Sequence, residues 1–319
     1  MAFDALVPKK AGVLALIAAA GVSLAPAPAD ARPAAPTDRQ IAAATRQAPG
    51  GLSALAWMVT DADTGTVLAA KNPHRRLAPA STLKTLFAVT VLPKFPADRV
   101  REVSAGDLAG LGAGSSVVGV HEGGRYTVAD LWRGVFLRSG NDAVHVLAAM
   151  NGGWSATARE MQQTANRLGA RDTTVKSPDG YDTPGQVSSA ADLTAFARAG
   201  LADEQFARYC STLRARFPEG GADSVQIENT NRLLVGSHGM AHYPGMIGVK
   251  NGYTSKAGNT LIAAARRNGH TLIATVLNPQ SGETNGVYKE AGSLLDWGFD
   301  HVNHPSPVAD DTGPAEDTP

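Results

Sequence analysis

The residues with the clearest capacity for chemistry are Ser81 and Lys84, three positions apart in an otherwise uncharged apolar segment from Pro79 to Leu92. In a helix this spacing places both side chains on one face, so the ammonium group can approach the hydroxyl. A helix that is apolar on nearly every side is buried, and burial lowers the pKa of a lysine. The resulting amine can take the proton of a serine hydroxyl. The pair therefore predicts a serine nucleophile with Lys84 as its base.

Two other segments place polar residues at the ends of predicted elements. Ser139-Gly140-Asn141 joins two predicted helices, 131–137 and 143–150, and we expect Gly140 to take the left-handed conformation that ends a helix. Lys250-Asn251-Gly252 follows a β-prone run, and its glycine lets another backbone come close. Taken singly, each segment also fits an ordinary helix end or strand end, and S-x-x-K arises by chance about once in a chain of this length.

In this order, the segments Ser81-Thr82-Leu83-Lys84, Ser139-Gly140-Asn141 and Lys250-Asn251-Gly252 resemble the motifs S-x-x-K, S-D-N and K-T-G of penicillin-recognising serine enzymes. Further segments narrow the resemblance to the D-alanyl-D-alanine carboxypeptidase family, which comprises the low-molecular-weight penicillin-binding proteins or S11-type serine peptidases. These segments are Asp63-Thr64-Gly65, Pro79-Ala80-Ser81, Leu168-Gly169, Asp179-Gly180 and residues 248–254. The resemblance covers about residues 40 to 300.

The resemblance implies a serine-type carboxypeptidase that removes the terminal D-alanine from peptidoglycan stem peptides and that β-lactam antibiotics acylate. It implies that Ser81 attacks the carbonyl between the two D-alanines while Lys84 accepts the proton. Ser139 would relay a proton to the leaving amine, Asn141 would hold the substrate amide, and Lys250 would attract the terminal carboxylate. The family's other substrate-binding positions correspond to Asn251, Gly252, Tyr253 and Thr254.

Asn251 departs from the family's pattern, which has Thr or Ser after the lysine of the third motif. In the family that hydroxyl helps to bind the substrate carboxylate. An amide can donate two hydrogen bonds, but its reach and geometry differ from those of a hydroxyl. We expect Thr254 to share the role, and the backbone N–H groups of Ser81 and Tyr253 to form the oxyanion hole.

Short β-prone runs lie towards both ends of the chain. Runs 55–60 and 66–70 are joined by a reversal that contains Asp and Gly, which predicts a hairpin. Runs 247–250, 260–265 and 271–277 are also β-prone, and Asn268-Gly269 between the last two is a strong hairpin signal. Apolar residues at helical spacing over 287–295 predict a final helix.

Residues 100–216, between these runs, are rich in helix signals, among them Thr127 and Asp130 at the spacing of a capping box. We therefore expect an α+β fold of the β-lactamase/transpeptidase type. Its mostly antiparallel sheet is built from both chain ends and covered by helices, with residues 100–216 as an inserted helical lobe. A cleft between the lobes is the expected site.

The two ends of the chain are expected to lie outside the catalytic domain, 38–303. Lys9 and Lys10 precede an apolar stretch and an A-x-A-like site, which predicts a signal peptide over 1–31. Residues 32–37 are expected to form a flexible leader, and 304–319 a disordered acidic, proline-rich tail. We expect the mature protein to be exported beyond the cytoplasmic membrane, to the periplasm, the cell wall or the medium, without an integral membrane segment.

Composition excludes several other classes. The chain has 29 Lys plus Arg and 29 Asp plus Glu, so it lacks the positive charge on which nucleic-acid binding depends. Cys210 is the only cysteine, and we expect it to be buried and structural. The glycines 110, 112 and 114 follow no predicted strand, and His238 and His242 have no third ligand nearby in sequence. Neither a dinucleotide, a metal nor any other cofactor is therefore expected.

Three other activities on the same fold stay open. A DD-endopeptidase uses the same chemistry on cross-links, so the sequence does not separate it from a carboxypeptidase. A serine β-lactamase shares the three motifs, but the E-x-x-L-N pattern of class A enzymes does not occur between Asn141 and Lys250. A catalytically inactive wall-binding protein would most simply have lost Ser81 or Lys84, and both are present.

Overall fold

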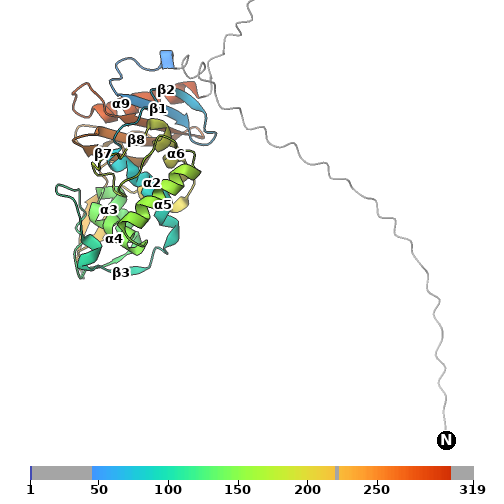
Figure 1. Cartoon of the computed structure of the whole chain (residues 1–319). Coiled ribbons are helices and arrows are strands. Elements are labelled where there is room, and N and C mark those ends of the chain that lie inside the picture. The colour runs from blue at the N-terminus through green and yellow to red at the C-terminus, as the bar shows by residue number, and fades with distance from the viewer. Residues whose placement is uncertain (2–44, 220–222, 303–319) are drawn as a thin grey trace, which may run out of the picture. The chain divides into compact units, whose positions relative to one another are not determined.

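The computed structural model describes residues 45–219 and 223–302, together with Met1 (Figure 1). The predicted signal peptide, leader and tail lie outside the described residues. Among the helices of the described ranges, none has both the length and the apolar character needed to cross a membrane.

One five-stranded antiparallel sheet is built from both ends of the described chain (Figure 1). The strand order is β2-β1-β9-β8-β7, so β1 pairs with β9 from the far end of the chain. The strands are β1 (Ala56–Asp61), β2 (Val67–Lys71), β7 (Met246–Thr254), β8 (Gly258–Arg267) and β9 (His270–Leu277). The predicted α+β class, with a sheet made from both chain ends, is confirmed.

Both predicted hairpins are present. β1 and β2 pair antiparallel after a tight reversal, and β8 and β9 pair through Asn268 and Gly269. These two residues have φ values of 50° and 85°, in the left-handed region that a two-residue hairpin turn requires. Asn and Gly tolerate this region better than other residues, which is why the dipeptide predicted the turn.

Helices cover both faces of the sheet, because side chains along each strand alternate between two apolar clusters. On one face, α9 (Gly286–His301) packs with Leu294 and Leu295 against residues such as Leu261. On the other face, α2 (Lys84–Val91) and α6 (Ala190–Leu201) pack against residues such as Ile262. The sheet is therefore the shared wall of two hydrophobic cores.

The middle block is mainly helical, as predicted. Its helices are α3 (Val128–Arg138), α4 (Asn141–Met150), α5 (Trp154–Arg167), α6 and α7 (Glu204–Cys210), and Figure 1 shows α3, α4 and α5 grouped together. The block also holds a short strand pair that we did not predict, β3 (Val100–Glu102) with β4 (Arg125–Thr127). Each strand has only three residues, and Tyr126 is the one buried side chain of the pair, so there is no apolar alternation to detect.

Three other features differ from the sequence prediction. A second short pair, β5 (Arg214–Pro218) with β6 (Ser224–Glu228), follows α7. The segment predicted as one helix from Pro79 begins instead as a 3₁₀ turn, η1 (Ala80–Leu83), before α2 and ends in η2 (Leu92–Lys94). Further short elements are η3 (Ala105–Leu108) and α8 (Arg232–Val235).

The ends of α3 show one correct and one wrong prediction. The capping box of Thr127 and Asp130 is present at its start. At its end, Ser139 and not Gly140 takes the left-handed conformation, with φ values of 57° and −58° respectively. Gly140 is needed for space, since a Cβ there would lie 2.7 Å from Asp142 Oδ1 and 3.1 Å from a methyl group of Val118.

Cys210 is buried at the end of α7, as predicted. Its Sγ donates a hydrogen bond to the carbonyl oxygen of Ile247 at 3.2 Å. Burial raises the pKa of the Cys210 thiol to about 12, so the thiolate required for nucleophilic chemistry is not formed near neutral pH.

Glu290 joins the last helix to the chain just before β1, and we predict that Glu290→Ala lowers the free energy of unfolding by about 1–3 kcal/mol. Its buried carboxylate accepts hydrogen bonds from the backbone N–H groups of Ser53 and Ala54, both at 3.0 Å. The substitution would leave these donors without their partner. Urea unfolding measures the loss, and Glu283→Ala is the control, because the Glu283 carboxylate is exposed and forms an ion pair with the exposed Lys289. Equal losses in the two variants would contradict the prediction.

Candidate active site

Ser81 and Lys84 meet at the junction of η1 and α2, deep in the fold. Lys84 Nζ lies 2.9 Å from Ser81 Oγ and donates a hydrogen bond to the carbonyl oxygen of Asp179 at 2.6 Å. The Lys84 side chain is only 1% exposed. Burial lowers the pKa of Lys84 to about 8, although the carboxylates of Asp179 and Asp142 act in the opposite direction. Near pH 8 a large share of Lys84 is therefore neutral, as a general base must be.

The backbone beside Ser81 is strained and closely packed. Ala80 has a φ of 50°, which is rare for a residue with a Cβ. Gly180, at a φ of 83°, lies against it, and a Cβ on Gly180 would be 2.0 Å from the Ala80 carbonyl oxygen. Only glycine allows this approach, which brings the neighbouring Asp179 carbonyl within reach of Lys84. Strained backbone of this kind clusters at active sites.

Ser139 and Asn141 lie where α3 ends and α4 begins. Asn141 Nδ2 donates a hydrogen bond to Ser115 Oγ at 3.1 Å. Within the described part of the chain, Ser139 Oγ and Asn141 Oδ1 are buried without a hydrogen-bond partner. Because buried polar atoms are nearly always paired, these two oxygens mark a place suited to a polar ligand.

The segment that precedes β4 is fastened to this junction by contacts that the sequence did not reveal. The Asp142 carboxylate accepts hydrogen bonds from the backbone N–H groups of residues 118, 119 and 120, at 2.8–3.1 Å. The Asn141 N–H donates to the Ser116 carbonyl oxygen at 2.8 Å, and Tyr181 Oη donates to that of Ala113 at 2.8 Å. Asp142 directly follows the second motif, and no sequence signal pointed to Ser115, because its contact with Asn141 joins positions 26 residues apart.

Two residues of the third motif face η1 from β7, the edge strand of the sheet. Lys250 is 1% exposed, and its Nζ donates a hydrogen bond to the Asn251 carbonyl oxygen at 2.8 Å. Burial, and then the charge of Lys84, lower the pKa of Lys250 well below its ordinary value. Gly252 lies against Ser81, because a Cβ at this position would be 2.7 Å from the Ser81 backbone nitrogen.

The other side chains of the third motif are directed elsewhere. Asn251 Oδ1 accepts a hydrogen bond from Thr230 Oγ1 at 3.1 Å, and Thr254 Oγ1 donates one to Asp182 Oδ1 at 2.7 Å. The Tyr253 side chain is 67% exposed. The fold thus brings Ser81, Lys84, Lys250 and Gly252 together, with the second motif close enough for Asp142 to act on the charge of Lys84. Thr254 is instead engaged by a carboxylate.

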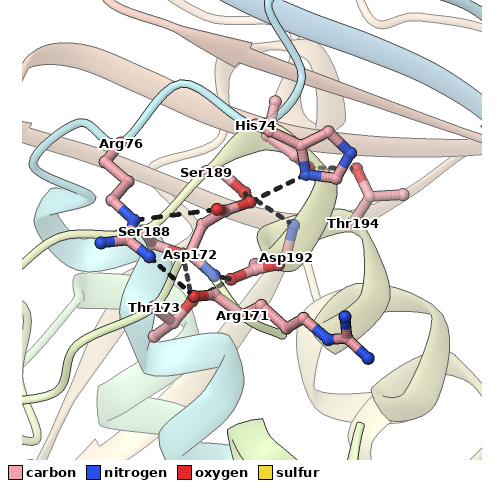
Figure 2. Close-up of polar contacts among 10 residues, drawn as sticks. His74, Arg76, Arg171, Asp172, Thr173, Ser188, Ser189, Asp192 and Thr194 are labelled. Carbon is pink, nitrogen blue, oxygen red and sulfur yellow. Dashed lines mark hydrogen bonds and ion pairs between the residues drawn. The ribbon is translucent and has the colours of Figure 1, made fainter. Parts of the chain in front are cut away.

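A polar cluster fixes the segment that leads to Ser81 (Figure 2). Asp172 Oδ2 lies 2.8 Å from His74 Nδ1 and accepts a hydrogen bond from Ser189 Oγ at 3.1 Å, while Arg76 lies 3.7 Å from Oδ1. Asp, His and Ser are the residue types of a catalytic triad. Here both His74 and Ser189 contact the carboxylate, so the histidine does not stand between serine and aspartate as proton transfer in a triad requires.

The same cluster continues into the start of α6. Thr173 Oγ1 donates to Asp192 Oδ2 at 2.6 Å and lies 2.9 Å from Ser188 Oγ, as Figure 2 shows. Ser188 and Leu77 exchange two backbone hydrogen bonds, both at 2.8 Å. These contacts hold residues 74–77 against the segment that carries Asp179. They therefore align the two segments of the chain that meet at Lys84.

The structure was also searched for a metal site and for surface hollows away from Ser81. In residues 45–219 and 223–302, no group of three or more His, Cys, Asp or Glu side chains could hold a metal ion. A surface hollow whose lining includes Ala62, Arg198 and Arg266 shares no residue with the Ser81 site. The cleft expected between the lobes stays a prediction.

Known proteins resemble this chain over most of the described region. Residues 42–281 match the family Peptidase_S11, D-alanyl-D-alanine carboxypeptidase. The D-alanyl-D-alanine carboxypeptidase DacB2 of Mycobacterium tuberculosis is 37% identical over 246 residues, which cover 76% of this chain and 81% of that protein. The chain spans 63% and 66% of two longer carboxypeptidase relatives.

Solved structures agree with the sequence match. The crystal structure of a D-alanyl-D-alanine carboxypeptidase from Mycobacterium tuberculosis H37Rv aligns with a TM-score of 0.71 at 36% identity, over 79% of this chain and 93% of that one. The Streptomyces K15 DD-transpeptidase aligns with a TM-score of 0.71 at 27% identity, over 79% and 99% respectively. The match to the family spans well over half of the sequence and includes all three motifs, and the chain belongs to the D-alanyl-D-alanine carboxypeptidase family of serine peptidases.

Proposed function

We propose that this carboxypeptidase cleaves the bond between the two terminal D-alanines of peptidoglycan stem peptides through an acyl-enzyme on Ser81. The observation that carries the proposal is the 2.9 Å contact between Ser81 Oγ and a buried Lys84 whose pKa is lowered to about 8. A neutral amine at this distance can remove the hydroxyl proton as the oxygen attacks a carbonyl carbon.

The reaction then has two stages. Ser81 Oγ bonds to the carbonyl carbon, Lys84 takes the hydroxyl proton, and the carbon–nitrogen bond breaks as the leaving amine receives a proton through Ser139. D-Alanine departs, and the rest of the peptide stays as an ester of Ser81. In the second stage water attacks the ester, which releases the shortened peptide and returns the proton to Ser81.

Backbone N–H groups would stabilise the oxyanion of each stage. The proposed donors are those of Ser81 and Tyr253, and the packing of Gly252 against the Ser81 nitrogen supports this pairing. Asn141, whose Oδ1 has no partner in the described residues, would accept from the substrate amide. Lys84 and Lys250 share one site, so a substrate anion that favours charge on Lys250 would favour the neutral form of Lys84.

The proposed substrate belongs to the cell wall, so the protein would act beyond the cytoplasmic membrane. The signal-peptide pattern of residues 1–31 supports export. Penicillins would act as covalent inhibitors at Ser81. A DD-endopeptidase would use the same groups, with a cross-linked peptide as the leaving amine.

We predict that the mature protein releases D-alanine from a stem pentapeptide, and that Ser81→Ala lowers kcat/KM by about 10⁴-fold or more, because the ester can no longer form. D-Alanine is measured by a coupled oxidase assay, with a cross-linked muropeptide dimer as the competing substrate. Retained activity in Ser81→Ala would refute the nucleophile assignment. Preferred cleavage of the dimer would instead support the endopeptidase.

Benzylpenicillin should leave a persistent adduct of one penicilloyl group on the mature protein and none on Ser81→Ala, since the same oxygen opens the β-lactam ring. An intact-mass time course detects it. A transient adduct with rapid consumption of the drug would favour the β-lactamase. The absence of any adduct would favour the inactive wall-binding protein.

Activity should rise with pH, with an apparent pKa of about 8 in kcat/KM. The pKa of Lys84 is lowered from 10.5, so the amine form becomes available at a pH where an exposed lysine is still charged. Initial rates of D-alanine release between about pH 6 and 9 test this. Lys84→Arg, which stays charged, should be inactive throughout, and a rate that falls across the range would contradict the assignment.

A further inference from the structure

Residues 179–182 form a short segment that contacts the Ser81 site at several points. The Asp179 carbonyl oxygen accepts a hydrogen bond from Lys84 Nζ at 2.6 Å. Gly180 packs against the backbone of Ser81, because a Cβ on this glycine would lie 3.1 Å from the Ser81 nitrogen. The first two residues of the segment therefore fix the base and the backbone of the nucleophile.

The next two residues reach other parts of the site. Tyr181 Oη donates a hydrogen bond to the Ala113 carbonyl oxygen at 2.8 Å, and the same loop contacts Asn141 through Ser115. Asp182 lies against the turn between β7 and β8. One short segment thus joins the base, the nucleophile, the loop beside the second motif and the end of the third motif.

The Asp182 carboxylate holds the end of β7 with both oxygens. Oδ1 accepts a hydrogen bond from Thr254 Oγ1 at 2.7 Å, and Oδ2 accepts one from the Lys256 backbone N–H at 3.1 Å. Thr254 Oγ1 in turn accepts a hydrogen bond from the Ala257 N–H at 3.0 Å. Hydrogen bonds to a carboxylate are stronger than those between neutral groups. Asp182 and Thr254 therefore fix the turn that leads from β7 to β8.

The backbone between Gly252 and Thr254 carries the proposed second oxyanion donor, the Tyr253 N–H. Gly252 is fixed on one side by its packing against the Ser81 nitrogen, where a Cβ would lie at 2.7 Å. Thr254 is fixed on the other side by Asp182. Because β7 is an edge strand, only β8 pairs with this stretch, and the Tyr253 side chain is 67% exposed. The Tyr253 N–H therefore lies between two fixed points, one of which depends on Asp182.

Oxyanion stabilisation depends on where the donors are held. An N–H group is effective at about 2.7–3.1 Å from the position that the negatively charged oxygen occupies in the transition state. A displacement of about 1 Å can lower the rate about 100-fold, even when the substituted residue lies outside the reacting groups. A contact that fixes the end of β7 can therefore contribute to catalysis without touching the substrate.

We propose that Asp182 is a positioning residue for the reaction, which fixes the Tyr253 N–H at the distance from Ser81 that the oxyanion requires. The inference rests on the proposed function and deepens it, because it names a residue outside the three motifs on which stabilisation of the transition state depends. Asp182 acts through Thr254 and the turn that follows, and it exchanges no proton with the substrate. Because the oxyanion forms after binding, the loss of Asp182 lowers kcat more than it raises KM.

The test compares Asp182→Ala with the wild type on the stem pentapeptide, using the full mature protein. We expect kcat to fall about 10- to 100-fold and KM to change less than about 3-fold, because the donor is displaced while substrate binding is kept. The apparent pKa in kcat/KM should stay at about 8, since Lys84 is held by the Asp179 carbonyl oxygen. Asp182→Asn should recover part of the loss, because its amide oxygen can still accept from Thr254.

Two further variants separate positioning from a general loss of stability. Asp203→Ala is the matched control, because the Asp203 carboxylate also accepts two backbone hydrogen bonds, both at 2.9 Å, but at the start of α7. Its kcat should stay at the wild-type value. Thr254→Val removes the hydroxyl partner of Asp182. The double variant Asp182→Ala/Thr254→Val should therefore lose less than about 3-fold in kcat beyond Asp182→Ala, as expected for two residues that act through one contact.

Each outcome bears on a different claim. An unchanged kcat in Asp182→Ala, or additive losses in the double variant, would overturn the inference and leave the proposed function in place. A shifted pH dependence would show that the substitution disturbs Lys84, and it would also overturn the inference. A wild-type protein that releases no D-alanine would overturn the proposed function and this inference with it. If Asp182→Ala does not fold, Asp182→Asn and Thr254→Val decide by the same comparison of kcat with KM.

Discussion

The burial of the Lys84 ammonium against the Ser81 hydroxyl is the constraint on which the rest of the structure depends. A buried amine is costly when charged, so its surroundings decide whether it acts as a base. The Asp179 carbonyl oxygen accepts a hydrogen bond from the amine at 2.6 Å, and it can do so only because Gly180 lets its segment approach the one that carries Ser81. The sheet, α2 and the polar cluster around Asp172 then keep these two segments in place.

Much of this architecture could be predicted because short sequence patterns specify its turns and helix ends. Asn268-Gly269 predicted a hairpin because both residues tolerate positive φ, and Thr127 with Asp130 predicted the start of a helix. The short strand pairs were missed because strands of three to five residues, with at most one buried side chain each, have no periodicity to detect. The wrong assignment at Gly140 has a steric origin: the glycine is required by its neighbours and not by its own backbone angles.

The site was predictable only where its residues stand in motifs. Motif order gave Ser81 and Lys84, but motifs carry no information on what a side chain meets across the fold. The partners of Asn251 and Thr254 come from loops about 20 and 70 positions away, so only the structure shows that both side chains are already engaged. A residue that departs from a motif can therefore be accommodated by contacts from elsewhere in the fold, as the hydrogen bond from Thr230 to the Asn251 amide oxygen shows.

The pairing of β1 with β9 also bears on when the protein can fold. Trp57 pairs with Val276, so the sheet cannot close until nearly all of the described chain has been synthesised. Pairings between distant segments are slow to form, because the entropy of closing a long loop is lost before any contact compensates for it. Until β9 has been synthesised, β1 has an unpaired edge, and the two hydrophobic cores lack the complete sheet that lies between them. The central sheet is therefore among the last parts of the described chain that can form as the protein is made.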